Sequence, residues 1–134
     1  MNDVEIKTDK NLLDINFITE FISNSYWARG RTIETMQICL DNSLNFGVYL
    51  QNRQIGFARI VTDYAQFAYI MDVFIQENYR GKGYSKKLMT YILEFDKLKN
   101  IKVWRLATSD AHGLYEQFGF HTVTKPENLM ELTK

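Results

Sequence analysis

The chain has 134 residues, 46% of them hydrophobic, so it can bury one core, and we expect a single domain over residues 1–134. Sixteen Lys and Arg residues balance sixteen Asp and Glu residues, so the broad positive field that non-specific nucleic-acid binding requires is absent. The longest apolar run, near Phe67–Ile75, is too short to cross a bilayer, and Asp3 and Glu5 interrupt any signal peptide. We therefore expect a cytoplasmic protein that binds neither nucleic acid nor membrane.

Cysteine and histidine are scarce. The single cysteine, Cys39, cannot close a disulfide within the chain, and its neighbours Ile38 and Leu40 favour a buried, inert thiol. The two histidines are His112 and His121, and no cluster has the spacing of metal ligands, so we expect no bound metal.

Hydrophobic spacing in the first half predicts two helices followed by three strands. Apolar residues three and four positions apart predict an amphipathic helix over Asn11–Ser23, and Thr32 is a suitable N-cap for a second helix that ends near Asn42. The three predicted strands are Phe46–Leu50, Ile55–Val61 and Tyr69–Ile75.

In the second half, strands and helices alternate. After Gly83 the period becomes helical as far as Lys97–Asn100, and a further short helix is stopped by Gly119. Strands are predicted at Lys102–Ala107, Phe120–Val123 and Leu129–Leu132. Because this alternation requires crossover connections, we expect parallel central strands after antiparallel hairpins, hence an α/β fold with a mixed central sheet and helices on both faces.

The most informative segment is a strand that enters a glycine turn and continues as a helix. Gly81 and Gly83 lie in the turn, and the first N–H groups of the helix converge there, which is typical of an anion site suited to phosphate. Four cations lie within eight residues of the same segment: Arg80, Lys82, Lys86 and Lys87.

Three phosphate-binding patterns compete for this turn. A dinucleotide fingerprint needs glycine where Lys86 stands, and a P-loop needs Gly-Lys-Ser/Thr after its spacer, so both fail. The pattern Arg80-x-x-Gly83-x-Ser85 after a Val-Phe-Ile strand resembles the acyl-CoA pyrophosphate loop of the GNAT superfamily of N-acetyltransferases. Ser85 replaces the family's usual Gly or Ala, but it is still small.

Two further segments strengthen the resemblance, which then covers essentially the whole chain. Ala111–Phe120 resembles the second CoA motif, Ala-x-x-Leu-Tyr-x-x-x-Gly-Phe, and Gln54–Arg59 resembles the Gly-Phe/Tyr segment of the third strand. One departure is Thr108, which stands where the family often has Asn and could bond the pantetheine arm through its hydroxyl.

The resemblance implies a GNAT-like acyl-CoA transferase fold with acetyl-CoA as co-substrate. The extended pantetheine arm would bond the backbone of Val73, Phe74 and Ile75, which could also hold the thioester oxygen as an oxyanion hole does. The remaining cofactor-binding residues implied are Arg80, Gly81, Lys82, Gly83, Tyr84, Ser85, Thr108 and Tyr115.

Three side chains are candidates for proton transfer. Tyr115 would donate a proton to the departing thiolate, although its position also suits a core residue. Asp72 would be the base if burial raised its pKa, or a structural ion pair with Arg59. His112 is a second candidate base or an exposed helix residue, and water is a third option.

The acceptor is the least specified part of the reaction. Tyr26, Trp27 and Arg29 lie in the loop between the first two helices, together with Arg31, and would bind substrate unless the loop is merely solvated. The leading hypothesis is acetyl transfer to a primary amine of a small molecule or peptide by direct attack; the alternative is a non-catalytic acyl-CoA-binding regulatory module. The sequence leaves a homodimer formed through edge strands open.

Overall fold

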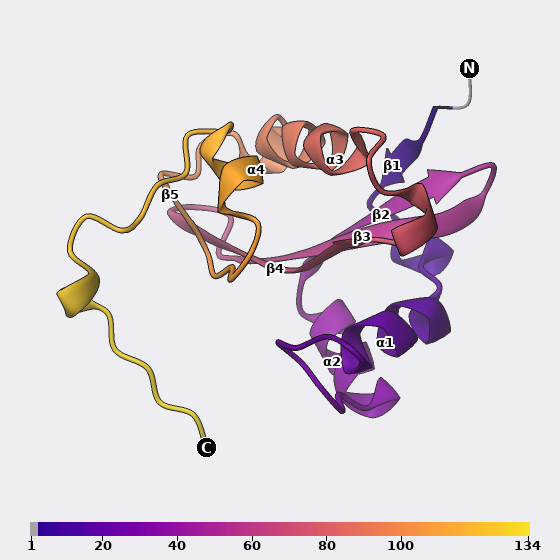
Figure 1. Cartoon of the computed structure of the whole chain (residues 1–134), viewed down its shortest axis with the longest axis horizontal. Helices are drawn as coiled ribbons and strands as arrows, with labels where there is room; N and C mark the ends of the chain where they lie inside the picture. The colour runs from indigo at the N-terminus through magenta and orange to yellow at the C-terminus, as the bar shows by residue number, and fades with distance from the viewer. Residues whose placement is uncertain (1–2) are drawn as a thin grey trace.

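The computed structural model describes residues 3–134, which contain one five-stranded sheet in the order β1-β2-β3-β4-β5 (Figure 1). Neighbouring strands are antiparallel except β4 and β5, which are parallel. The strands are β1 (Glu5–Lys7), β2 (Leu44–Leu50), β3 (Arg53–Thr62), β4 (Phe67–Ile75) and β5 (Val103–Leu106). The mixed sheet expected from the sequence is therefore confirmed.

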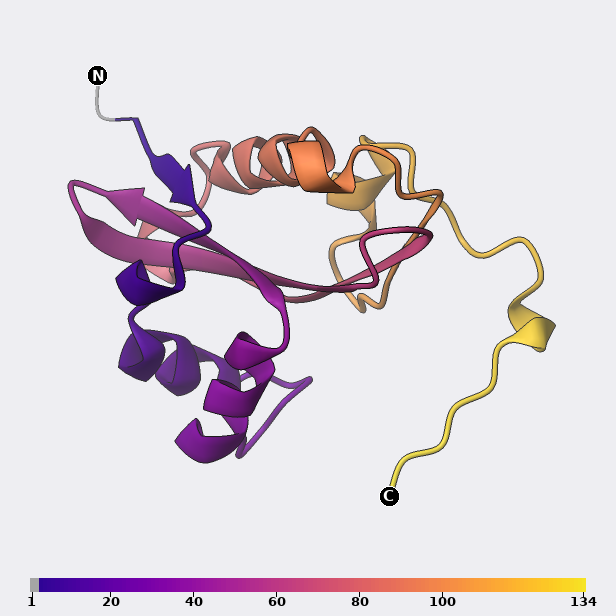
Figure 2. The ribbon, with the colours of Figure 1, turned by 180° about the vertical axis from the view of Figure 1, so that it is seen from behind.

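Helices cover both faces of the sheet. Helices α3 (Tyr84–Leu93) and α4 (His112–Glu116) lie on one face, and α1 (Ile15–Ser23) and α2 (Ile33–Asp41) lie on the other (Figures 1 and 2). Short 3-10 turns occupy Lys10–Leu12, Glu77–Tyr79, Asp96–Leu98 and Pro126–Asn128. Among the described residues, no helix is both long and apolar enough to cross a membrane.

Local side-chain contacts fix where the first two helices begin. The Asp14 carboxylate accepts from the Phe17 N–H at 3.0 Å, and the Thr32 hydroxyl accepts from the Thr35 N–H at 3.2 Å. Each contact satisfies a donor that the first turn of a helix leaves unpaired. Thr32 is thus confirmed as an N-cap, whereas the first helix begins at Ile15 rather than at Asn11.

Two apolar layers hold the sheet between its helices. The layer under α3 includes Leu88, Met89, Ile92, Ile60 and Ile70, all almost fully buried. The layer under α1 and α2 consists of Ile18, Ile22, Met36, Leu40, Phe57 and Phe74. Phe21 of α1 stacks on Phe74 with ring centroids 3.9 Å apart, which ties α1 to the end of β4.

Two strand predictions are wrong, and one strand was not predicted. Phe120–Val123 and Leu129–Leu132 are not strands, because neither segment is paired with the sheet, and the C-terminal end of the chain runs away from the body (Figures 1 and 2). The short strand β1 (Glu5–Lys7) was not predicted, since three residues are too few to show a periodic pattern.

An extra residue in β4 changes the face on which its side chains lie. Phe57 pairs with Phe74 and Arg59 pairs with Met71, so Asp72 and Val73 together oppose Ala58. Asp72 has φ 55°, a left-handed conformation that Asp tolerates better than most residues. This β-bulge directs Asp72 and Phe74 to the α1 and α2 side, while Ile70 before the bulge faces α3.

Close packing beside the bulge requires glycine at position 56. A β-carbon there would lie 2.9 Å from the Phe74 carbonyl oxygen and 2.7 Å from Ile75 Cδ1. We therefore expect Gly56→Ala to lower the free energy of unfolding by about 1–3 kcal/mol, because the backbone of β4 must shift to make room for the new methyl group. Urea unfolding of the purified chain measures this.

The matched control is Gly113→Ala in α4, where a β-carbon meets no atom within 4 Å. Alanine is the better helix former by about 1 kcal/mol, so this variant should be as stable as the original chain or more so. Equal stability of Gly56→Ala and the original chain would refute the packing argument.

Candidate functional site

A cleft opens where β4 and β5 separate. The parallel pairing runs from Phe67 with Val103 to Ile70 with Leu106, and β4 then continues to Ile75 paired with β3 but no longer with β5. The cleft has a volume of about 680 Å³. Its walls come from α1, the α1–α2 loop, the end of β4 and the start of α4, with Phe21, Tyr26, Trp27, Val73, Phe74, Ile75, Arg80, Ser85, Asp110, Leu114 and Tyr115 among the lining residues.

The unpaired edge of β4 turns alternate backbone groups toward this cleft. The Gln76 N–H donates to the Ile55 carbonyl of β3 at 2.7 Å. Because strand backbone groups alternate, Phe74 also faces β3, and the backbones of Val73 and Ile75 face the open side. The side chain of Phe74 lies in the core, so the expected backbone role at this strand end fits Val73 and Ile75 rather than Phe74.

The turn before α3 has free backbone donors. Gly81 and Gly83 have φ of 79° and 82°, the left-handed conformation expected of glycine. Within residues 3–134, no acceptor is hydrogen-bonded to the N–H groups of residues 81–86. A β-carbon at Gly83 would meet no atom within 4 Å, so conformation rather than crowding requires glycine there. These donors form an anion-binding concavity at the positive end of a helix.

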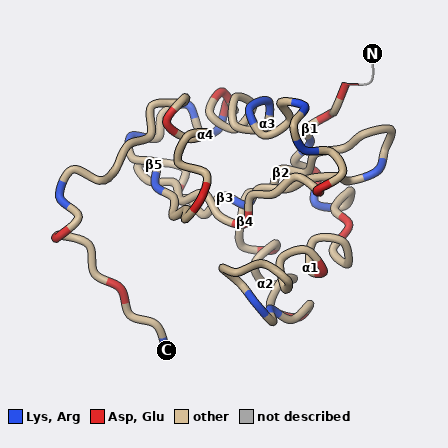
Figure 3. The backbone as a smooth tube through the Cα atoms, in the orientation of Figure 1, with Lys and Arg blue, Asp and Glu red and all other residues tan. Residues whose placement is uncertain are grey.

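Basic residues gather at the same turn, at the start of α3 in Figure 3. Arg80 Nε donates to the Ile75 carbonyl at 2.9 Å, and its guanidinium lies 6.0 Å from the centre of the Phe21 ring. The ammonium of Lys82 lies 6.0 Å from the Tyr79 ring. Arg80 and Ser85 line the cleft; between them Gly81, Lys82 and Gly83 form the turn, and Tyr84 is the first residue of α3.

Lys87 does not belong to this basic group. Its ammonium pairs with Asp3 at 2.7 Å and donates to the Val4 carbonyl at 3.2 Å. The expectation of four cations at the turn is therefore wrong for Lys87, because the helix turns this side chain toward the β1 end of the sheet.

Asp72 is an ion-paired carboxylate. Its oxygens accept from Arg31 at 2.7 Å, from Arg59 Nε at 2.8 Å and from Trp27 Nε1 at 3.0 Å, and its side chain is fully buried. Burial raises the pKa of Asp72, but the hydrogen bonds and charges of Arg59 and Arg31 outweigh burial and leave the pKa below its ordinary value. The expected raised pKa is thus wrong, and the ion pair with Arg59 is confirmed.

Tyr115 lies where the cleft meets a second hollow of about 570 Å³. The residue is 8% exposed, and its hydroxyl has no hydrogen-bond partner among the described residues. Burial raises the pKa of Tyr115 most, and the negative charge of Asp110 raises it further. The phenol therefore keeps its proton throughout the neutral range.

Thr108 and His112 lie near Tyr115 but outside the main cleft. The Thr108 hydroxyl accepts from the Ala111 N–H at 3.0 Å and lines the second hollow. His112 is exposed at the start of α4 and lines a third hollow on the far side of Tyr115. The exposed-residue interpretation of His112 agrees with this placement.

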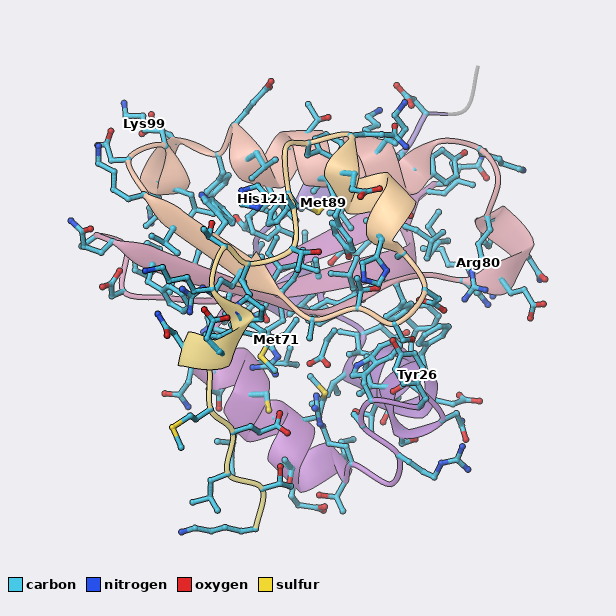
Figure 4. The ribbon with its side chains drawn as sticks, turned by 60° about the vertical axis from the view of Figure 1, so that its left-hand side comes forward. Tyr26, Met71, Arg80, Met89, Lys99 and His121 are labelled. Carbon is cyan, nitrogen blue, oxygen red and sulfur yellow. The ribbon has the colours of Figure 1, made fainter. Side chains whose placement is uncertain are left out.

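The α1–α2 loop reaches across to the α4 side. The Tyr26 hydroxyl accepts from the Ser109 N–H at 3.3 Å, and Tyr26 and Trp27 line both the cleft and the second hollow. Figure 4 shows Tyr26 and Arg80 on the same side of the molecule. Arg29, expected to bind substrate, is exposed and lines neither hollow.

Two site residues were not predicted as such. Arg31, expected among the substrate-binding loop residues, lies in the second hollow and is ion-paired with Asp72, a role the sequence did not predict. Asp110 lines both hollows, and no pattern in the sequence distinguishes it from other surface carboxylates. In residues 3–134, no group of three or more His, Cys, Asp or Glu side chains could hold a metal ion.

A mixed sheet that parts beside a glycine turn and a helix N-terminus places the protein in the class of α/β folds with an anion-binding turn. The family profile described as Acetyltransferase (GNAT) domain matches residues 41–122. A crystal structure from Xanthomonas campestris pv. campestris, described as belonging to the GNAT family, is 42% identical with a TM-score of 0.96 and covers 100% of this chain and 95% of that one. The chain belongs to the GNAT family of acetyltransferases.

Two other relatives illustrate the range of similarity. The uncharacterized N-acetyltransferase ycf52 of Gracilaria tenuistipitata var. liui is 30% identical over 125 residues, which is 89% of this chain. The chain spans less than two thirds of the length of the curated relatives it matches. A predicted acetyltransferase of Clostridium acetobutylicum, solved with acetyl-CoA, shares the fold with 17% identity, a TM-score of 0.70 and coverage of 99% of this chain and 96% of that one.

The Asp72 cluster should make stability depend on pH. Asp72→Asn leaves Arg31 and Arg59 without a counter-charge, and we expect it to cost about 3–5 kcal/mol at pH 7. Because the folded-state pKa lies below the ordinary 3.8, the stabilisation is complete above pH 3.8 and is lost as the pH falls through the folded pKa. The difference in the free energy of unfolding between Asp72→Asn and the original chain should therefore become smaller as the pH falls.

Urea unfolding between pH 7 and pH 3 measures this difference. The control is Asp110→Asn, which removes an exposed carboxylate and should change stability by less than about 0.5 kcal/mol. If the difference in free energy of unfolding between Asp72→Asn and the original chain stays constant down to pH 3, the charge of Asp72 does not stabilise the fold.

Proposed function

We propose that this chain transfers the acetyl group of acetyl-CoA to a primary amine of a small molecule or peptide by direct attack. The observation that carries the proposal is the juxtaposition of two sets of free backbone donors. One set is the unpaired edge of β4 at Val73 and Ile75, and the other is the N–H groups of residues 81–86 at the start of α3.

Acetyl-CoA has the two chemical features that these donors suit. Its pyrophosphate is an anion of the kind that a helix N-terminus binds, and Arg80 and Lys82 add positive charge beside it. Its pantetheine arm is an extended amide chain, which can bond a strand edge as another strand would. The Clostridium acetobutylicum relative solved with acetyl-CoA supports the same ligand for this chain.

Residues at the inner end of the cleft would serve the chemical step. The Val73 N–H faces the cleft and would polarise the thioester carbonyl and hold the negative charge that develops on its oxygen. Tyr115, which stays protonated because burial raises its pKa, would donate a proton to the departing thiolate. The thioester itself supplies an activated acyl group when bound.

The acceptor side favours a cation. Asp110 and Glu20 carry carboxylates on the wall of the cleft, where they would attract an ammonium group. Asp72 is a poor base for that ammonium, because its two arginines lower its pKa and occupy its oxygens. The amine would therefore lose its proton to water in the open cleft.

Binding of acetyl-CoA should depend on the turn. We expect Arg80→Ala to weaken binding about 10- to 100-fold, since it removes a charged hydrogen-bond donor. Gly83→Val should weaken it as well, because a β-branched residue is strained at φ 82° and crowds the free N–H groups. Isothermal titration measures the acetyl-CoA affinity of both variants. The control is Arg53→Ala, which removes an exposed cation of the β2–β3 hairpin. Unchanged affinity in both turn variants would refute the site.

Turnover should depend on the Tyr115 hydroxyl. Tyr115→Phe keeps the ring packed against Phe120 and should lower turnover about 10- to 1000-fold with little change in acetyl-CoA affinity. Because the pKa of Tyr115 lies above the ordinary 10.0, activity that needs this proton should fall only above pH 10. If Tyr115→Phe has the turnover and the pH profile of the original chain, Tyr115 serves only as a core residue.

A panel of amines tests the reaction itself. Free thiol released from acetyl-CoA is measured with small amines, amino acids and peptides bearing a free amino group. Acetyl transfer to any of them supports the proposed enzyme. Tight acetyl-CoA binding without turnover across the panel would instead identify a non-catalytic acyl-CoA-binding module.

A further inference from the structure

The second hollow adjoins the acetyl-CoA cleft and is lined in part by the α1–α2 loop. Its volume of about 570 Å³ is that of a small-molecule site. Arg80 and Ser85 at the anion-binding turn line the cleft but not this hollow. The residues common to both spaces are Tyr26, Trp27, Val73, Asp110, Ala111 and Tyr115. A ligand in the second hollow therefore reaches Val73 and Tyr115 without occupying the turn.

The buried charges beside this hollow do not cancel. Asp72 carries one negative charge, and it pairs with Arg31 at 2.7 Å and with Arg59 at 2.8 Å. Two cations on one carboxylate leave an excess of one positive charge. Arg59 does not line the hollow, whereas the side chain of Arg31 lines it and is 17% exposed. The excess charge therefore faces the hollow at Arg31, which is the only cation among the described residues that line it.

Part of the Arg31 guanidinium is free to bind a ligand. Its Nη1 donates to Asp72 and lies 3.9 Å from Met36 Sδ. Within residues 3–134, its Nε and Nη2 have no hydrogen-bond partner, and neither atom is fully buried. Arg59, by contrast, directs all three of its side-chain nitrogens to partners. The Nε and Nη2 of an arginine lie on one edge of a planar group with parallel N–H bonds, which is the geometry that binds the two oxygens of a carboxylate.

Contacts among the lining residues hold Arg31 in place. Trp27 Nε1 donates to Asp72 at 3.0 Å, so the indole and Arg31 are held by the same carboxylate. Tyr26 packs edge-on against Trp27, with ring centroids 5.2 Å apart. Figure 4 shows Tyr26 and Met71, which also line the hollow, on the side of the sheet that α1 and α2 cover. The position of Arg31 is therefore fixed before a ligand binds, which lowers the entropic cost of binding.

Two further carboxylates line the same hollow. Asp110 and Glu131 are both exposed, and Asp110 also lines the cleft. Their negative charges suit an ammonium group, whereas the excess positive charge at Arg31 suits an anion. A hollow with charges of both signs favours a ligand that carries both groups.

We propose that the acceptor is an amine that also carries a carboxylate, as amino acids do, and that Arg31 selects it. The carboxylate would accept from Nε and Nη2 of Arg31, and the amine would lie where the two spaces meet, beside Val73 and Tyr115. A neutral group in place of the carboxylate would leave the free edge of Arg31 without a partner in a filled hollow, which is unfavourable. This assignment of the acceptor rests on the proposed acetyl transfer.

The transfer is balanced for such an acceptor. The ammonium first loses a proton to water, and the amine nitrogen attacks the thioester carbon. The C–N bond forms as the C–S bond breaks, and Tyr115 donates a proton to the departing thiolate. The nitrogen releases a second proton, which restores the phenol. The products are an N-acetylated carboxylate, free coenzyme A thiol and one proton, and Arg31 only holds the acceptor.

Binding to the chain saturated with free coenzyme A tests recognition without turnover. Isothermal titration at pH 6, where the amines are protonated, compares amino acids and ω-amino acids each with its carboxamide, which removes only the negative charge. We expect the carboxylate of each favoured pair to bind about 10- to 100-fold more tightly. Equal binding within every pair, or tighter binding of the amides, would overturn the proposal. Tighter binding of amines that carry phosphate would overturn the choice of a carboxylate.

Variants of the α1–α2 loop test the role of Arg31. Arg31→Lys keeps a charge beside Asp72 but lacks paired donors on one edge, so kcat/KM for carboxylate acceptors should fall about 10- to 100-fold while that for their amides is unchanged. The ratio of the two cancels differences in amine basicity. The control is Arg29→Ala, which removes an exposed cation of the same loop that lines neither space and should keep the original ratio. An equal loss for carboxylates and amides would show a structural role and overturn the proposal.

The two proposals can fail separately. Carboxylate-selective binding that is lost in Arg31→Lys, with no thiol released from acetyl-CoA, would support the anion site and refute acetyl transfer. Thiol release with carboxylates and amides alike, and no selectivity in binding, would support acetyl transfer and refute the role of Arg31.

Discussion

The site depends on a single extra residue in β4. Because Asp72 and Val73 together oppose Ala58, the strand changes face between Ile70 and Phe74. Asp72 then lies under the α1–α2 loop, where Arg31 and Trp27 reach it, and Phe74 becomes the anchor for Phe21 of α1. The bulge thus fixes α1 and the α1–α2 loop against the same strand whose free edge faces the cleft.

Charge is distributed locally in a molecule whose formal net charge is zero. Cations lie at the turn before α3, carboxylates lie on the cleft wall at Glu20 and Asp110, and the buried Asp72 is neutralised by its arginines. A neutral molecule exerts little long-range attraction on either substrate, so recognition must come from contacts within the cleft. An anion bound at the turn before α3 and a cation bound beside Glu20 or Asp110 would each be held at short range by a different part of the cleft.

Sequence predicted the parts of the site that depend on local chemistry. Gly81 and Gly83 adopt the left-handed backbone that their turn requires, and Thr32 caps its helix. The sequence could not show on which face of the sheet Asp72 lies. A β-bulge shifts the alternation of side chains by one residue, and the hydrophobic pattern does not reveal it. The pairing of Arg31 with Asp72 and the place of Asp110 in the cleft were missed for a related reason: loop side chains acquire a role only when the fold brings distant segments together.

The strands predicted at Phe120–Val123 and Leu129–Leu132 show a different limit. Their residues have the apolar character of strands, yet a strand forms only where another strand edge is available for its hydrogen bonds. The third hollow lies between β5 and residues 120–123, and the apolar residues Met130 and Leu132 are exposed. The apolar pattern therefore marks residues that could form strands, but it does not supply the neighbouring edge with which a strand must pair. That neighbour is set by how distant segments fold together, so an alternating or apolar run near the end of the chain cannot by itself establish another strand of the sheet.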